Sequence, residues 1–249
     1  MNILGIDVGG SCIKGAIVNT TTGRLCSRRM EIATPQPATP QLVGEAVSKL
    51  VKKCDWNGPI GCGVPAVIQN GVAKTAANID VSWIGTDVQR LLQEKTGCFC
   101  AVVNDADAAG LAEMRFGAGR GEDGAVLILT LGTGIGSALF SQGQLFPNLE
   151  FGALPLYGAP AEHYASAAVR TAQKLNWQEW AGRLNEFFHL AERLISPELI
   201  IIGGGVSSKS QEFFPFLQTT AKLLPARSEN QAGSIGAACY AALNCDDKG

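Results

Sequence analysis

The sequence has no uninterrupted apolar run close to the ~18 residues that a membrane-spanning helix needs, which argues against a transmembrane segment. The chain enters an apolar stretch directly after Met1 and Asn2, and this start predicts no signal peptide. An excess of basic residues is absent too. The 20 Lys and Arg residues stand against 22 Asp and Glu, for a net charge of −2, which argues against general nucleic-acid binding.

Charged residues make up only 17% of the 249 residues, whereas 46% are hydrophobic. This composition allows a sizeable core to be buried, and the length suits one large domain or two modest ones.

The sequence also lacks Cys-x-x-Cys pairs and the G-x-S-x-G motif of many hydrolases. Its 8 cysteines are scattered, mostly within apolar segments, which predicts reduced thiols in a cytoplasmic protein. A metal site remains the alternative, although no cluster of His, Cys and Asp has metal-ligand spacing.

Glycine, in contrast, is abundant, with 30 residues. An apolar strand ends at Asp7-Val8, turns through Gly9-Gly10-Ser11, and continues as a second apolar strand that contains Lys14. Glycines let backbone amides approach an anion, so Gly9, Gly10, Ser11 and Lys14 are candidates to bind phosphate. Since the Asp7 carboxylate would repel phosphate, it indicates a divalent cation between the two, and hence phosphoryl transfer.

A second segment has the same pattern. Placing Asp7 over Thr130 puts Gly9 over Gly132 and Ser11 over Gly134, and the two hairpins reach further glycine turns at Gly23 and Gly143. The pair predicts a duplicated fold in which each half supplies a phosphate turn, the second one formed by Gly132, Thr133 and Gly134. Two glycine-rich hairpins in an ordinary sheet are the alternative.

The remaining pattern is that of an α/β protein in which an antiparallel hairpin opens each half. Strands are expected at 2–8, 12–18, 24–32, 60–67, 101–103 and 199–202, with an extended proline-rich loop at 34–40. Helices are expected at 41–54, 88–95, 106–116, 162–174, 177–194, 209–223 and 231–243, the last one Ala- and Gly-rich and therefore closely packed.

Asn104 and Asp105 follow a buried strand and precede a helix, where ligands gather in open α/β sheets. Asp105 could deprotonate an attacking hydroxyl group, and Asn104 could hold neighbouring hydroxyl groups. Alternatively, Asp105 is only the N-cap of the helix over 106–116.

Three further groups of residues have both a functional and an ordinary interpretation. Gly204 and Gly205 follow an apolar strand and could accept a phosphate or form a plain turn. Glu150 and Glu162 could bind sugar hydroxyl groups or be solvated. Lys74, Arg115 and Arg120, with Lys14, could line a basic groove or belong to ordinary surface.

Together these residues and their order resemble the ROK family of sugar kinases, in the actin-like ATPase superfamily, and within it the polyphosphate glucokinase branch. The resemblance runs from Ile3 to about Ala242. The segments that carry it are 5–11, 34–40, 75–85, 104–110, 129–137 and 203–207. It implies a two-lobed actin-like (ribonuclease H-like) fold with a duplicated βββαβα core and a cleft between the lobes. The lobes would comprise 1–104, with the helix 231–245 packed back on it, and 105–230.

The resemblance also implies a reaction and a set of roles. A phosphoryl group would pass from polyphosphate, ATP or both to the 6-hydroxyl of glucose or a close hexose, with Asp105 as the base. Asn78, Asn104, Glu150 and Glu162 would bind the sugar, and Asp7 would act through Mg²⁺. The expected form is a cytoplasmic homodimer that binds neither nucleic acid nor membrane.

Two departures from the family pattern stand out. Residues 152–161 have no cysteine, where many ROK kinases carry a zinc knot, so no structural zinc is expected. Ala153 replaces a histidine that contacts the sugar, which predicts weaker hexose binding.

A sugar-binding regulator or pseudokinase of the same family is the alternative function. The family's repressors carry an N-terminal helix-turn-helix, whereas the first strand here begins at residue 2 or 3. The presence of Asp7, Asn104, Asp105 and both glycine turns favours the enzyme.

Overall fold

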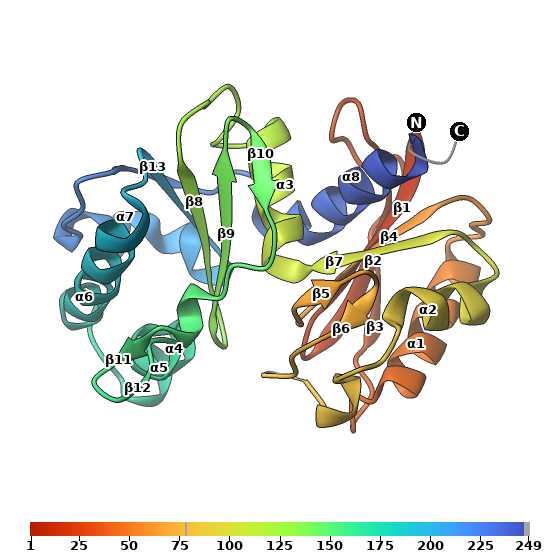
Figure 1. Cartoon of the computed structure of the whole chain (residues 1–249), viewed down its shortest axis with the longest axis horizontal. Helices are drawn as coiled ribbons and strands as arrows, with labels where there is room; N and C mark the ends of the chain where they lie inside the picture. The colour runs from red at the N-terminus through yellow and green to blue at the C-terminus, as the bar shows by residue number, and fades with distance from the viewer. Residues whose placement is uncertain (78, 247–249) are drawn as a thin grey trace. The chain divides into compact units, whose positions relative to one another are not determined.

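The computed structural model describes residues 1–77 and 79–246 (Figure 1). Contacts divide the chain into two compact units, Met1–Ala112 with the segment from Gln231 onward, and Glu113–Asn230. The chain passes from the first to the second unit within helix α3 (Asp105–Phe116). Asn78, which the sequence predicts to bind substrate, lies outside the described residues.

The first unit contains a five-stranded sheet in the order β3-β2-β1-β4-β7. Strands β1, β2 and β3 are antiparallel neighbours, whereas β4 and β7 continue the sheet from β1 in parallel. The strands are β1 (Asn2–Val8), β2 (Cys12–Asn19), β3 (Met30–Ala33), β4 (Ile60–Val64) and β7 (Cys100–Asn104).

The second unit repeats this topology. Its sheet has the order β10-β9-β8-β13-β14, with antiparallel β8, β9 and β10 and parallel β8, β13 and β14. The strands are β8 (Val126–Leu131), β9 (Ile135–Ser141), β10 (Gln144–Phe146), β13 (Leu199–Gly203) and β14 (Lys222–Pro225). The predicted duplicated core, with a hairpin opening each half, is therefore confirmed.

The two hairpins agree in their turns as well. Gly23 and Gly143 both adopt the left-handed conformation, with φ of 71° and 70°, which glycine reaches without steric cost. The strand registers leave four residues, 9–12, between the paired residues Val8 and Ile13, and three residues, 132–134, between the paired residues Leu131 and Ile135. The alignment of the halves thus holds up to Gly9 and Gly132 and shifts by one residue beyond them, so Ser11 does not match Gly134.

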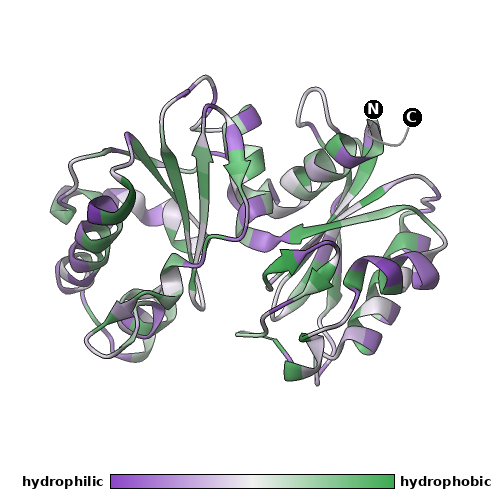
Figure 2. Cartoon of the chain, viewed as in Figure 1, coloured by the Kyte–Doolittle hydropathy of each residue, from purple (hydrophilic) through white to green (hydrophobic). Residues whose placement is uncertain are grey.

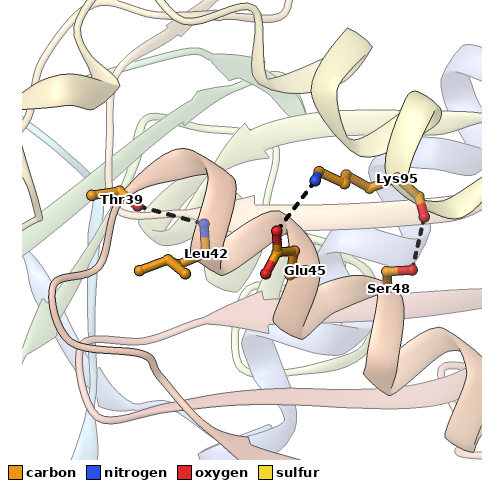
Figure 3. A network of polar contacts seen from close by, with 5 residues as sticks. All are labelled: Thr39, Leu42, Glu45, Ser48 and Lys95. Atoms are coloured by element: carbon orange, nitrogen blue, oxygen red, sulfur yellow. Dashed lines mark hydrogen bonds and ion pairs between the residues drawn. The ribbon is translucent and has the colours of Figure 1, made fainter.

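One face of the first sheet packs against two helices, α1 (Pro40–Lys53) and α2 (Val88–Thr96). Leu4 and Ile6 of β1 and Leu50 of α1 are fully buried in this core. Polar contacts join the helices at the surface, where the Ser48 hydroxyl donates to the Lys95 carbonyl at 2.7 Å (Figure 3). Figure 2 shows hydrophilic residues along the outer parts of both helices.

The other face of this sheet packs against α8 (Ala232–Asp246) with almost nothing between the backbones. A Cβ atom built on Gly5 would lie 1.8 Å from the Ser234 carbonyl oxygen, and one on Gly61 would lie 1.8 Å from that of Ala237. The close packing expected of the Ala- and Gly-rich final helix is therefore confirmed.

The second sheet packs against α6 (Trp177–Ile195), whose core side is largely aromatic. Trp180, Phe187 and Phe188 are fully buried with residues of β8 and β13. The Trp180 indole N–H donates to the Ala165 carbonyl at 2.9 Å, which satisfies the one polar group that this side chain buries.

Three expected elements differ in the structure. The strand expected at 24–32 begins later and is shorter, since β3 covers only Met30–Ala33. The helix expected at 162–174 is divided into α4 (Glu162–Ala165) and α5 (Ala167–Ala172), because Ser166 is extended and caps α5. The helix expected at 209–223 is wrong: only Ser210–Phe213 (α7) is α-helical there, and β14 begins at Lys222 because it gains a backbone ladder with β13.

Two short hairpins, β5 (Ile68–Gln69) with β6 (Val72–Ala73) and β11 (Pro155–Leu156) with β12 (Ala159–Pro160), were not expected. Among the described residues, no helix is both long and apolar enough to cross a membrane.

The contact between α8 and β4 gives a direct test of this packing. Gly61→Ala would force the helix and strand apart, since its Cβ would lie 1.8 Å from a backbone oxygen. We expect the free energy of unfolding, measured in urea, to fall by at least about 1–3 kcal/mol. The control is Gly44→Ala in α1, whose Cβ would meet nothing closer than 3.4 Å. It should raise stability by up to about 1 kcal/mol, and equal stability of the two variants would contradict the close approach of α8.

Candidate active site

The first glycine turn has backbone donors with no acceptor among the described residues. The Gly9 amide donates to the Cys12 carbonyl at 3.1 Å, whereas the amides of Gly10 and Ser11 have no acceptor within residues 1–77 and 79–246. A Cβ atom on Gly10 would meet nothing within 4 Å, so the space beside the turn is open. Adjacent free amides in a glycine turn suit an anion.

Asp7 lies beside this turn, on the sheet face that α8 covers. A Cβ atom on Gly233, near the start of α8, would lie 2.6 Å from the Asp7 carboxyl carbon, so the helix begins directly against the carboxylate. Desolvation raises the pKa of Asp7, and the positive charges of Lys14 and Arg29 oppose this rise. Lys14 is the register partner of Asp7 on β2 and thus compensates its charge.

The residues present fit Mg²⁺ bound mainly by water and phosphate. Among the described residues, no group of three or more His, Cys, Asp or Glu side chains could hold a metal ion by itself. Mg²⁺ typically retains several waters and needs only one or two carboxylates besides substrate phosphates. Since the Asp7 carboxylate is desolvated, a nearby cation would stabilise its charged form.

Asn104, rather than Asp105, caps α3. Its side-chain oxygen accepts hydrogen bonds from the amides of Ala106 at 2.9 Å and Asp107 at 3.1 Å. Its side-chain nitrogen donates to the Ala66 carbonyl at 3.2 Å, and the residue is buried. These bonds fix Asn104, and the second N–H of its side-chain amide has no acceptor among the described residues.

Asp105 is the first residue of α3 and is half-buried. One oxygen of its carboxylate accepts a hydrogen bond from the Ala106 amide at 2.8 Å. The start of a helix stabilises a carboxylate in its charged form, which is the form that a general base requires.

The second glycine turn resembles the first in its unused donors. The Gly132 amide donates to the Gly134 carbonyl at 3.0 Å, and the Gly132 carbonyl accepts from the Ala168 amide at 3.0 Å. Over the described parts of the chain, the amides of Thr133 and Gly134 have no acceptor. A Cβ atom on Gly132 would meet nothing within 4 Å. Each half of the fold therefore offers two free amides at its glycine turn.

The glycines after β13 lie next to this second turn. Gly204 has φ of 84°, and a Cβ atom there would lie 2.3 Å from the Leu131 carbonyl oxygen, directly before Gly132. The Ser207 hydroxyl donates to the Gly204 carbonyl at 2.8 Å and fixes the segment, while space remains beside Gly205. The structure thus brings together the two glycine segments that the sequence predicts for phosphate in this unit.

Glu162 and Glu150 lie within electrostatic reach of each other. The Glu162 carboxylate accepts a hydrogen bond at 3.2 Å from the amide of Ile135, the residue that ends the second turn. Desolvation raises the pKa of Glu150, and the negative charge of Glu162 raises it further. Glu162 is therefore more than a solvated surface residue.

Ser137 is a contributing residue that the sequence did not single out. It is fully buried, and its hydroxyl donates to the Leu149 carbonyl at 2.6 Å and accepts from the Phe151 amide at 2.8 Å. These bonds flank Glu150 and fix its backbone. A hydroxyl group within an apolar strand was the available signal. Ala153, close to Glu150 in the chain, is exposed, as is His163.

The interaction between the two glutamates can be tested without a substrate. Glu162→Gln keeps an oxygen to accept from the Ile135 amide but removes the negative charge. Since that charge raises the pKa of Glu150, we expect this pKa to fall in the variant. A ¹³C NMR titration of the side-chain carboxyl groups measures it. An unchanged Glu150 pKa would show that the carboxylates do not interact.

Comparisons with known proteins agree with this arrangement. A polyphosphate glucokinase from Mycobacterium tuberculosis is 45% identical over 235 residues, which cover 94% of this chain and 89% of the relative. The crystal structure of an inorganic polyphosphate/ATP-glucomannokinase from Arthrobacter sp. strain KM is 46% identical, with a TM-score of 0.94 over 98% of this chain and 99% of that one.

A ROK family glucokinase from Streptomyces griseus, solved in complex with glucose and AMPPNP, shares the fold at 24% identity. Its TM-score is 0.84 over 98% of this chain and 100% of that one. The predicted actin-like ATPase fold is therefore confirmed. The family model of the ROK family matches residues 3–149. With this match and with 45% identity over most of its length, the chain belongs to the ROK family.

Proposed function

We propose that this chain is a kinase that transfers a phosphoryl group from polyphosphate or ATP to the 6-hydroxyl of glucose or a close hexose. The observation that carries the proposal is the pair of glycine turns, each with two adjacent amides that have no acceptor in the described residues. The sequence identity to a polyphosphate glucokinase and to a polyphosphate/ATP-glucomannokinase supports both the reaction and the donor.

In this proposal Asp105 takes the proton of the attacking hydroxyl group. Its place at the start of α3 stabilises the charged carboxylate that this step needs. Asn104, fixed by three hydrogen bonds, would orient the sugar with its remaining N–H. Glu150 and Glu162 would accept hydrogen bonds from sugar hydroxyl groups, and we assign Asn78 to sugar binding as well.

The phosphates would be bound by backbone amides. We assign this role to Gly9, Gly10 and Ser11 in the first turn and to Gly132, Thr133 and Gly134 in the second, with Gly204 and Gly205 beside the latter. Lys14 would add positive charge. Asp7 would hold Mg²⁺ through water, and the bound ion would offset the negative charge of the phosphates.

A long anionic donor would also favour basic residues on the way to the turns. Lys74 and Arg120 are exposed and Arg115 is half-buried, and we assign them to this contact. We further expect a homodimer in the cytoplasm. Support for a reducing compartment comes from the cysteines, since all 8 are free thiols.

A sugar-binding regulator without catalysis is the competing function. The presence of Asp7 and Asp105 together with the free amides of both turns favours the enzyme. A protein that only binds a sugar needs neither a base, nor a carboxylate for a metal ion, nor amides that bind phosphate. The relatives with more than 40% identity are named as kinases, which also favours the enzyme.

The first test is an assay of the purified protein with a hexose panel, Mg²⁺, and either ATP or polyphosphate, with hexose 6-phosphate as the measured product. Replacement of the base by Asp105→Asn should lower kcat by at least ~10²-fold. Near-normal kcat in this variant would contradict the role of Asp105. The absence of turnover with every hexose and donor would favour the regulator.

The glycine turns can be tested separately. The protein itself would tolerate Gly10→Ala, because the added Cβ meets nothing within 4 Å. A donor phosphate close to the backbone would meet this methyl group, so we expect a rise in donor KM of about 2- to 10-fold, the scale of one weakened hydrogen bond.

The matched control for this variant is Gly182→Ala on α6, where the new Cβ also meets nothing within 4 Å. It should leave donor KM unchanged. An unchanged donor KM in Gly10→Ala as well would show that the donor does not approach the first turn.

A further inference from the structure

The loop between β3 and α1 donates hydrogen bonds to three successive carbonyl groups of the first glycine turn. The Thr34 hydroxyl donates to the Gly9 carbonyl at 2.6 Å, and the Thr34 amide donates to that of Ser11 at 3.0 Å. The Gln36 side-chain nitrogen donates to the Gly10 carbonyl at 3.4 Å. Thr34 is buried, so its hydroxyl bond is shielded from water.

These bonds determine which way the amides of the turn point. In a planar trans peptide, the carbonyl of one residue and the N–H of the next point in opposite directions. With the carbonyls of Gly9 and Gly10 directed to the loop, the amides of Gly10 and Ser11 point away from it. These are the two amides that have no acceptor in the described chain.

The second half of the fold has the same arrangement, but a different group donates the hydrogen bond. The carbonyl of Gly132, which aligns with Gly9, accepts from the backbone amide of Ala168 at 3.0 Å. The next amide, that of Thr133, is again free in the described part of the chain. In both halves, the aligned carbonyl therefore accepts a hydrogen bond from outside the turn. The hydrogen-bond donor is a side chain in the first half and a backbone amide in the second.

The loop is itself firmly anchored. The Trp83 indole N–H donates to the Ala38 carbonyl at 2.8 Å, and Trp83 is fully buried. Thr39, at the end of the loop, caps α1 through the Leu42 amide (Figure 3). A turn with two successive glycines has many accessible conformations, and its ordering before the ligand arrives lowers the entropic cost of binding.

We infer that Thr34 is a positioning residue for the phosphoryl donor, assisted by Gln36: it holds the first turn with its amides directed toward the donor phosphates. This inference rests on the proposed function, since it assumes that the turn binds a donor. Thr34 itself touches no donor in this scheme. Its loss should therefore weaken donor binding and leave hexose binding unchanged.

The test compares three variants by donor KM, hexose KM and kcat, and by calorimetric binding of tripolyphosphate with Mg²⁺ in the absence of sugar. Thr34→Val keeps the shape and the backbone bond to Ser11 but removes the hydroxyl donor. It leaves the Gly9 carbonyl without its partner, so donor KM and the tripolyphosphate Kd should rise about 10-fold or more. Thr34→Ser should restore both, and hexose KM should stay within about 2-fold in both variants.

Thr39→Ala is the matched control in the same loop. It removes the cap of α1 and should lower the unfolding midpoint without a change in donor KM. Three results would overturn the inference. The tripolyphosphate Kd of Thr34→Val could equal that of the wild type, its hexose KM could rise as much as its donor KM, or Thr39→Ala could show the same rise in donor KM. The absence of tripolyphosphate binding by the wild type would also overturn it. Binding without transfer to any hexose would contradict only the proposed function, and the binding comparison would still decide the role of Thr34.

Discussion

The buried charge of Asp7 constrains the structure around the first glycine turn. Its carboxylate is desolvated under the start of α8, which raises its pKa, and the charges of Lys14 and Arg29 oppose that rise. Gly233 provides the room that the carboxylate needs, and Gly5 provides the room for the helix backbone two residues earlier on β1. The packing of α8 and the electrostatics of Asp7 are therefore one feature, which explains why small residues on the helix and a charge on the strand occur together.

The duplication of the fold explains why the glycine turns come as a pair, and the two halves differ in what surrounds each turn. Both hairpins present free amides and have a carbonyl held from outside the turn. Only the first has a carboxylate, Asp7, at the position that Thr130 occupies in the second. The second turn instead adjoins Gly204 and supplies the Ile135 amide to Glu162. In the proposed function, one half would thus combine phosphate with a cation, and the other would combine phosphate with the sugar.

Local patterns were sufficient to predict the hairpins and the glycine turns, because each depends on residues close together in the chain, and the order of several such segments indicated the family. The contributions of Thr34 and Ser137 depend on partners 25 and 12 residues away, so the sequence could at most mark Ser137 as a hydroxyl group within an apolar strand and could not indicate what it binds. Asn104 and Asp105 are both good N-cap residues, and only the structure shows that Asn104 caps α3. The segment 209–223 has helix-like spacing, yet β14 forms in it because β13 offers an edge for pairing.

We propose that the two glycine turns bind the phosphates of the donor through their backbone amides. Amide chemical shifts of the ¹⁵N-labelled protein, recorded during titration with tripolyphosphate and Mg²⁺, test it most directly. We expect the largest saturable changes at Gly10, Ser11, Thr133 and Gly134, the amides that have no acceptor in the described chain. Saturable changes confined to other residues, with these four amides unmoved, would contradict it.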